Sequence, residues 1–196
     1  MFLETICIKN GKVRNLAFHL ERMRATAQKF HFTAPDLPDL EKLATGLPTS
    51  GKIKCSVIYR DQIEDLKLSV YIPRSISSLK LVESDIDYSS KFADRTGLNN
   101  LLKLKGDCDE ILIVQNGLIT DVSYANVVLE HKNGLFTSKK PLLKGTKRQL
   151  LLDQRRIIEA DISIENLQTF SKLYLINAML DIEEQQGIEV KLAINH

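Results

Sequence analysis

Alternating apolar and polar residues predict most of the strands in the first half of this chain. Residues 2 to 8 begin the pattern, and the pair Asn10-Gly11 that follows them is typical of a tight hairpin turn. The alternation recurs over residues 53 to 59 and 66 to 72, and a short apolar run follows at residues 79 to 82. We therefore expect an N-terminal sheet with one buried face.

Helical spacing of apolar residues appears between these strands. Leu16, Leu20, Met23, Ala27 and Phe30 recur at intervals of three and four, which predicts a helix that runs to about residue 30 with Asn15 as its N-cap. A second, shorter helix is predicted over residues 39 to 44, since Pro38 precedes it and Gly46 follows it.

The second half of the chain again combines hairpins with helices. We expect helices over residues 94 to 105 and from Gly145-Thr146 to about residue 160. Strands are predicted over residues 111–114, 118–122, 125–129, 135–137, 162–164, 173–176 and 188–192. Asn-Gly pairs join several of these strands directly, so the sequence predicts an α+β protein with antiparallel hairpins.

A polar stretch at residues 83 to 90 is the candidate hinge between two lobes. We therefore expect a small N-terminal α/β lobe over residues 1–85 and a larger lobe over residues 86–196.

The composition is that of an ordinary globular protein. The chain has 196 residues, 43% of them hydrophobic and 27% charged, with a formal net charge of +2. This balance argues against a nucleic-acid or membrane partner. Three scattered cysteines outside any CxxC pattern favour neither a disulfide framework nor a metal site and suit a reducing compartment. The start, Met1 to Glu4, lacks the basic and apolar regions of a signal peptide, so we expect a cytoplasmic protein.

Two features of the sequence are candidates for binding an anion. Gly145 and Thr146 stand at a predicted helix start, where the N–H groups of a helix attract negative charge, although a plain N-cap without a ligand is the commoner arrangement. Lys147, Arg148, Arg155 and Arg156 after them are equally consistent with a solvated basic face. His19 and Arg22 share one side of the first predicted helix, as a phosphate-binding pair or as a surface pair.

Eight short segments occur in an order that is more specific than any one of them. They are Glu4–Ile6, His19–Arg22, Lys91–Arg95, Asp109–Val114, Asn116–Asn126, Gly134–Thr137, Gly145–Arg148 and Asn177–Met179. Together they resemble the class IV aminotransferases, the fold-type IV pyridoxal-phosphate enzymes, which include branched-chain and D-amino acid aminotransferases and 4-amino-4-deoxychorismate lyase. The resemblance implies the two-lobed fold of D-amino acid aminotransferase with a shortened N-terminal lobe, the cofactor pyridoxal 5'-phosphate in the cleft, and a homodimer.

The resemblance also implies roles for single residues. Lys91 is similar to the lysine that holds the cofactor as a Schiff base and then moves protons at the substrate carbon. Arg22 is similar to the arginine that binds the cofactor phosphate. Gly145 and Thr146 resemble the helix-start pair at the same phosphate, and Asn177 and Ala178 match a strand end near it.

Asp121 departs from the family pattern. The resemblance aligns it with a glutamate that keeps the pyridine nitrogen protonated, and aspartate is shorter by one carbon, about 1.5 Å. This leaves three interpretations: the backbone comes closer, a water bridges the gap, or the ring is a weaker electron sink.

The resemblance gives three hypotheses for the function. Lys91 followed by Arg95, with Asn177-Ala178-Met179, resembles a lyase that releases pyruvate and forms 4-aminobenzoate for folate synthesis. Arg60 and Arg74, with Arg95, are candidates for the substrate carboxylates, and exposure to solvent is the alternative for Arg60 and Arg74. The second hypothesis is an aminotransferase acting on a small amino acid (branched-chain or D-amino acid type), and the third is a non-catalytic protein that retains the fold.

Overall fold

The computed structural model describes residues 1 to 195, which form two compact units. Unit 1 comprises Met1–Pro73 and Ser90–Asp94, and unit 2 comprises Arg74–Ser89 and the residues from Arg95 onward. The chain thus crosses between the units three times, and one crossing falls in the stretch 83 to 90 expected to be a hinge. The first unit ends at Pro73 rather than at residue 85, because strand β5 (Leu79–Glu83) pairs within unit 2.

Unit 1 contains an antiparallel four-stranded sheet in the order β2-β1-β3-β4. Its strands are β1 (Phe2–Lys9), β2 (Lys12–Val13), β3 (Lys52–Tyr59) and β4 (Ile63–Val70). The Asn10-Gly11 turn joins β1 to β2 with both residues at positive φ, 55° and 69°, as the hairpin prediction requires. The alternation in the sequence is matched by alternating burial along β1 and β3.

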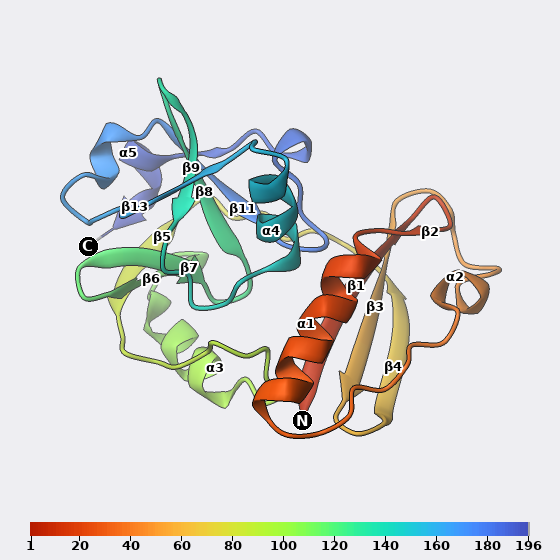
Figure 1. Cartoon of the computed structure of the whole chain (residues 1–196). Helices are drawn as coiled ribbons and strands as arrows, with labels where there is room; N and C mark the ends of the chain where they lie inside the picture. Colours follow the sequence, from red (N-terminus) through yellow and green to blue (C-terminus); the bar gives the residue numbers. More distant parts are fainter. Residues whose placement is uncertain (196) are drawn as a thin grey trace. The chain divides into compact units, whose positions relative to one another are not determined.

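Two helices complete unit 1, and the longer one, α1 (Leu16–Lys29), lies along the sheet (Figure 1). Its residues Met23 and Ala27 are buried, and Met23 joins the apolar cluster of β1 and β3. Asn15 precedes α1 as predicted, but it is left-handed and its side chain caps no N–H group. In α2 (Leu40–Leu43) the Asp39 side chain accepts from the Lys42 N–H and caps the helix.

The segment with Lys91 belongs to unit 1 because it pairs with the start of β1. The Leu3 N–H donates to the Lys91 carbonyl at 2.9 Å, and the Ala93 N–H donates to the Met1 carbonyl at 3.0 Å. Between these bonds, Phe2 and Phe92 form a β-bridge with their rings 5.5 Å apart. The backbone of Lys91 is therefore fixed by hydrogen bonds on the strand that also carries Glu4.

Unit 2 is built on a nine-stranded sheet with the path β10-β9-β8-β7-β6-β5-β13, and β11 joins it beside β8. Its strands are β5 (Leu79–Glu83), β6 (Glu110–Gln115), β7 (Leu118–Val122), β8 (Asn126–His131), β9 (Gly134–Ser138), β10 (Ile158–Ala160), β11 (Lys172–Ile176), β12 (Ile188–Glu189) and β13 (Ile194–Asn195). Its helices are α3 (Thr96–Leu102), α4 (Thr146–Asp153) and α5 (Val190–Ala193), and three short 3-10 turns lie at Lys103–Lys105, Leu167–Thr169 and Ile182–Glu184.

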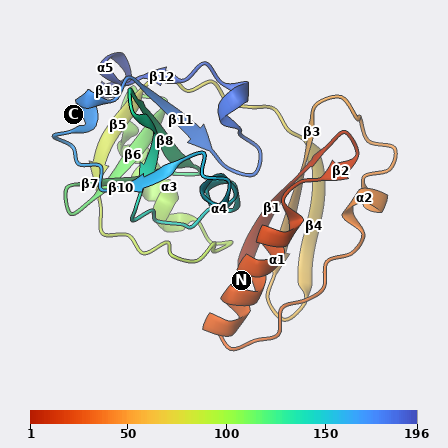
Figure 2. The same cartoon turned by 45° about the horizontal axis from the view of Figure 1, so that its top comes forward.

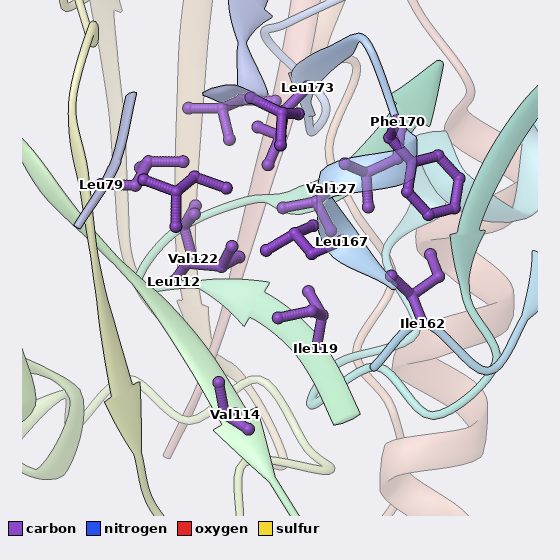
Figure 3. Packing of buried hydrophobic residues seen from close by; sticks show 14 of the residues in the cluster. Leu79, Leu112, Val114, Ile119, Val122, Val127, Ile162, Leu167, Phe170 and Leu173 are labelled. Carbon is purple, nitrogen blue, oxygen red and sulfur yellow. The ribbon is translucent and has the colours of Figure 1, made fainter. Parts of the chain in front are cut away.

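The sheet of unit 2 curls around one apolar cluster (Figure 2). Leu79 of β5, Ile119 of β7 and Leu173 of β11 come from well-separated strands, yet all three are at most 1% exposed in the same cluster (Figure 3). A flat sheet would not bring these strands to a common core. Burial of such residues contributes about 25 cal/mol per Å² of apolar surface and holds the curl closed.

Several elements of unit 2 differ from the sequence predictions. The helix predicted to reach residue 160 ends at Asp153, because Arg155 is left-handed and the chain returns as β10 alongside β9. Residues 162 to 164 make only an isolated bridge between Ser163 and Leu118. The strand predicted at residues 188 to 192 becomes helical after Glu189. The predicted hairpins are antiparallel, and three further strand pairs, β5 with β6, β9 with β10 and β5 with β13, are parallel. Within residues 1 to 195, no helix is both long and apolar enough to span a membrane.

Candidate active site

Unit 1 holds a buried carboxylate that is hydrogen-bonded to an arginine and a histidine. Glu4 lies on the inward face of β1 and is 0% exposed. Arg22 of α1 donates to both of its oxygens, from Nε at 2.8 Å and from Nη2 at 2.5 Å, and His19 one turn earlier is bonded to it through Nδ1 at 2.6 Å. The spacing of three residues places His19 and Arg22 over the same strand residue, so the surface-pair interpretation is wrong.

The environment keeps Glu4 ionised and favours neutral His19. Burial opposes ionisation of Glu4, but the charge of Arg22 and the hydrogen bonds from His19 and Arg22 outweigh it and lower the pKa of Glu4 to about 2. Burial also lowers the pKa of His19, and the charges of Arg22 and Lys91 add to that effect, whereas its bond to Glu4 opposes it. A neutral His19 that donates its Nδ1 hydrogen to Glu4 fits this arrangement.

Lys91 is partly buried and close enough to lower the pKa of His19. Lys91 and Arg22 therefore both lie near His19 in unit 1, and they are the two residues that the family resemblance assigns to the cofactor aldehyde and phosphate. A guanidinium has five N–H donors, and the bonds to Glu4 engage two of them, so three lie outside this pair of bonds. An arginine oriented in this way suits an anion such as a phosphate.

Arg60, also in unit 1, has a different environment. It lies in the turn between β3 and β4 with its side chain 55% exposed, 3.5 Å from the carboxylate of Asp61. Its guanidinium carbon is 5.9 Å from the ring centre of Phe32. Arg60 is therefore exposed to solvent, which was the alternative interpretation of this residue in the sequence.

In unit 2, predicted site residues gather on the turn between β7 and β8, residues 123 to 125. Asp121 and Asn126 are a cross-strand pair at its base, and both are buried. Asn126 Nδ2 donates to Asp121 Oδ1 at 2.8 Å, and the Leu143 N–H donates to Asp121 Oδ2 at 3.0 Å. Both oxygens of Asp121 thus accept hydrogen bonds from the protein itself.

Burial raises the pKa of Asp121 to about 7. The donors from Leu143 and Asn126 and the charge of Arg148 lower it in part, but no cation bonds directly to this carboxyl among the described residues. Desolvation therefore dominates, in contrast to Glu4.

Arg74 stacks on the turn rather than extending alone into solvent. Its guanidinium carbon is 4.4 Å from the ring centre of Tyr124, and its Nη2 donates to Glu110 at 3.0 Å. Glu110 is 0% exposed and also accepts from the Ser123 hydroxyl at 3.0 Å. The charge of Arg74 is balanced by this carboxylate, although the Arg74 side chain is 54% exposed.

Arg95 and Asn177 hold the backbone of the same turn. Arg95 Nη2 donates to the Ser123 carbonyl at 2.7 Å, and Asn177 Nδ2 donates to the Tyr124 carbonyl at 3.3 Å. The Asn177 side-chain oxygen accepts from the N–H groups of Met179 and Leu180 and so shapes the turn that contains Ala178. Four predicted residues, Arg74, Arg95, Asp121 and Asn177, therefore meet at one hairpin.

The start of α4 lies against this hairpin. A Cβ atom on Gly145 would overlap with Asn126 Oδ1, so a side chain here would force Asn126 to move. Thr146, Lys147 and Arg148 are at most 9% exposed, which makes the solvated basic face wrong for Lys147 and Arg148. Lys147 pairs with Asp181, whereas Arg155 beyond the helix is exposed.

Sequence reasoning missed Leu143, and it quoted Glu4, Glu110 and Asn126 within motifs without giving any of them a role. Glu4 carried a usable signal, because a carboxylate at an inward position of an alternating strand needs a buried partner. Leu143 carried none, since its contribution is its backbone. Within residues 1 to 195, no three His, Cys, Asp or Glu side chains are grouped so that they could hold a metal ion.

Comparisons with known proteins identify the family of this chain. Residues 93–183 match the family model described as amino-transferase class IV. A crystal structure from Haemophilus somnus 129pt, provisionally assigned as a 4-amino-4-deoxychorismate lyase, is 38% identical, covers 92% of this chain and 97% of its own, and superposes with a TM-score of 0.83. This chain belongs to the class IV aminotransferase family. It is therefore a member of an enzyme family, and the predicted family and two-lobed α+β fold with a short N-terminal lobe are confirmed.

Two further relatives of this class IV protein extend the comparison. An uncharacterized protein of Haemophilus influenzae is 32% identical over 181 residues, which are 90% of this chain and 96% of that protein. A hypothetical aminotransferase from Mycobacterium tuberculosis, in its PLP-bound form, is 17% identical with a TM-score of 0.77 and covers 91% of this chain and 77% of its own. The latter likeness concerns the fold alone.

Proposed function

We propose that this protein is a pyridoxal-phosphate-dependent lyase that acts on 4-amino-4-deoxychorismate or a closely similar substrate. The observation that carries the proposal is the 38% identity, over nearly the full length of both chains, to the Haemophilus somnus protein with that provisional assignment. The PLP-bound aminotransferase with the same fold supports the choice of cofactor. The products are pyruvate and 4-aminobenzoate, and the protein then serves folate synthesis in the cytoplasm.

The residues present fit a phosphorylated aldehyde. Lys91 supplies the amine that condenses with the aldehyde. Arg22, oriented by Glu4, supplies a guanidinium for the phosphate. Gly145 and Thr146 stand at the start of α4, where the backbone N–H groups of the first turn attract an anion.

When bound, the cofactor ring withdraws electrons from the substrate carbon that loses its proton. The protein's part is to hold that carbon within reach of Lys91, whose amine accepts and returns the proton. Asn177 and Ala178 form a turn against the Tyr124 carbonyl, and we assign them to the border of the phosphate site. Arg74 and Arg95 are the proposed contacts of the substrate carboxylates in unit 2, and Arg60 is the proposed contact in unit 1.

The test of the reaction is product analysis with 4-amino-4-deoxychorismate and purified, cofactor-loaded enzyme. The proposal predicts pyruvate and 4-aminobenzoate in equal amounts, without any added oxo acid. An aminotransferase would instead release no pyruvate from this substrate and would require an oxo acid to turn over a small amino acid. Absence of both activities, with the cofactor bound, would reject the lyase and favour the non-catalytic hypothesis.

The arginines and the oligomeric state have separate tests. Arg74→Ala is expected to raise KM about tenfold with little change in kcat. This is the result for a residue that binds the substrate equally strongly in the ground state and in the transition state. We further propose a homodimer, which sedimentation of the loaded enzyme measures directly. A monomer with full activity would contradict that assignment.

A further inference from the structure

The side chains of Asp121 and Asn126 both hydrogen-bond to the backbone of Leu143. We call this set of three hydrogen bonds the grip on Leu143. The Leu143 N–H donates to Asp121 Oδ2 at 3.0 Å, and the Leu143 carbonyl accepts from Asn126 Nδ2 at 2.8 Å. Asp121 Oδ1 accepts the other hydrogen of Asn126 Nδ2 at 2.8 Å. Leu143 lies in a loop, and these two side chains satisfy its backbone N–H and carbonyl as a neighbouring strand would in a sheet.

The grip on Leu143 continues into the first turn of α4. Asn126 Oδ1 occupies the space beside the Gly145 Cα atom where a Cβ would stand. The Gly145 carbonyl then accepts from the Gln149 N–H at 2.9 Å, the first hydrogen bond of the helix. The position of the helix start, and of the N–H groups of its first turn, is therefore set by the Asp121–Asn126 pair.

We propose that Asp121 is a positioning residue for the start of α4 and not the acid that holds the cofactor ring nitrogen. Both of its oxygens have donors from the protein, and a ring nitrogen would have to share one of them with Asn126 or Leu143. An aspartate, with one carbon fewer than glutamate, has the length to bond Leu143 from β7. The departure from the family's glutamate is then an adaptation of the chain to this grip.

The first test measures the grip without reference to the cofactor. Amide hydrogen exchange of residues 139 to 149 is compared in wild type and in Asp121→Asn. In Asp121→Asn, an NH2 group replaces one of the two oxygens that now accept from Asn126 and Leu143, so one of these donors loses its acceptor. We therefore expect about tenfold faster exchange at Leu143 and in the first turn of α4. Asp109→Asn is the matched control, because this carboxylate of the same unit accepts from the N–H groups of Ser77 and Ser78 and has no contact with Leu143, and it should leave that segment unchanged. Unchanged exchange in Asp121→Asn would overturn the proposal.

The second test uses Asp121→Glu and rests on the proposed cofactor. A longer side chain displaces Leu143, so we expect faster exchange in the segment and a roughly tenfold weaker affinity for pyridoxal phosphate, with the affinity for unphosphorylated pyridoxal unchanged. If Asp121 served the ring nitrogen, Asp121→Glu would keep the exchange pattern and raise turnover, which would overturn the proposal. Faster exchange in a protein that binds neither compound would uphold the grip and reject only the proposed function.

Discussion

Each unit of this protein has a buried carboxylate in its candidate site, Glu4 in unit 1 and Asp121 in unit 2, and these two groups have opposite electrostatics. Glu4 in unit 1 is bonded to Arg22 and His19, and its pKa is lowered to about 2. Asp121 in unit 2 is bonded to the amide of Asn126 and the Leu143 N–H, and burial raises its pKa to about 7. Burial alone therefore does not determine the charge state of these two carboxyls; the charge of the bonding partner does.

The difference suits what each carboxylate orients. Glu4 orients a cation, and an ionised Glu4 holds the guanidinium of Arg22 in one position through two bonds. Asp121 orients neutral backbone and amide groups, and these donors need only an acceptor, not a full charge. In the proposed roles, the first arrangement presents a guanidinium to an anion, and the second sets the path of a loop.

The largest effect on stability is expected from removing the guanidinium of Arg22, the partner of Glu4. In Arg22→Met, Glu4 stays buried without its guanidinium, so the free energy of unfolding should fall by about 3–5 kcal/mol at pH 7, as for a broken buried ion pair. Urea unfolding measures the change. The double variant Glu4→Gln/Arg22→Met is the control and should recover part of the loss, whereas a double variant that is less stable still would show that Glu4 does not depend on Arg22.

The pH dependence of stability separates the two carboxylates. The folded-state pKa of Asp121 is raised to about 7, so the free energy of unfolding falls as the pH rises from about 4 to 7. Below about pH 4 the burial of Asp121 costs no stability, and above pH 7 it costs on the order of 4 kcal/mol. The folded-state pKa of Glu4 is lowered, so its contribution is present above about pH 4.5 and is lost as the pH falls towards 2. Urea unfolding from pH 4 to 8 should show a downward slope in wild type that Asp121→Asn reduces. An identical slope in both proteins would contradict the assignment.

A smaller effect is expected at Gly145. Its φ of −69° is open to any residue, so only the contact with Asn126 opposes a side chain there. Gly145→Ala should cost about 1–3 kcal/mol through overpacking. In an Asn126→Ala background the same substitution should cost clearly less, and equal costs in the two backgrounds would show that Asn126 is not the obstacle.

The smallest effect is expected at the exposed Arg60. Its ion pair with Asp61 lies in solvent at 3.5 Å, so Arg60→Ala should change the stability by no more than about 0.5 kcal/mol. Because Arg60 is also a proposed substrate contact, the same variant should raise KM. A large loss of stability would mean that Arg60 has a structural role that its exposure hides.

The sequence predicted what depends on neighbours in the chain. The hairpins at Asn10-Gly11 and Asn116-Gly117 and the helix that places His19 beside Arg22 follow from local spacing, and they are present. The end of α4 was not predictable, because Arg155 adopts a left-handed conformation that sequence patterns assign to glycine or asparagine. The pairing of the Lys91 segment with β1 and the grip on Leu143 depend on contacts between residues that are distant in the chain. Local sequence patterns give no signal for such contacts.

The most direct test of the account is the site at which the cofactor attaches. Purified protein is incubated with pyridoxal phosphate, its near-violet absorbance is recorded, and borohydride then fixes any covalent link before the peptides are analysed by mass spectrometry. The account predicts one phosphopyridoxyl group on the peptide that contains Lys91, and no absorbance band in Lys91→Ala. Attachment to a different lysine, or a band that Lys91→Ala retains, would contradict it.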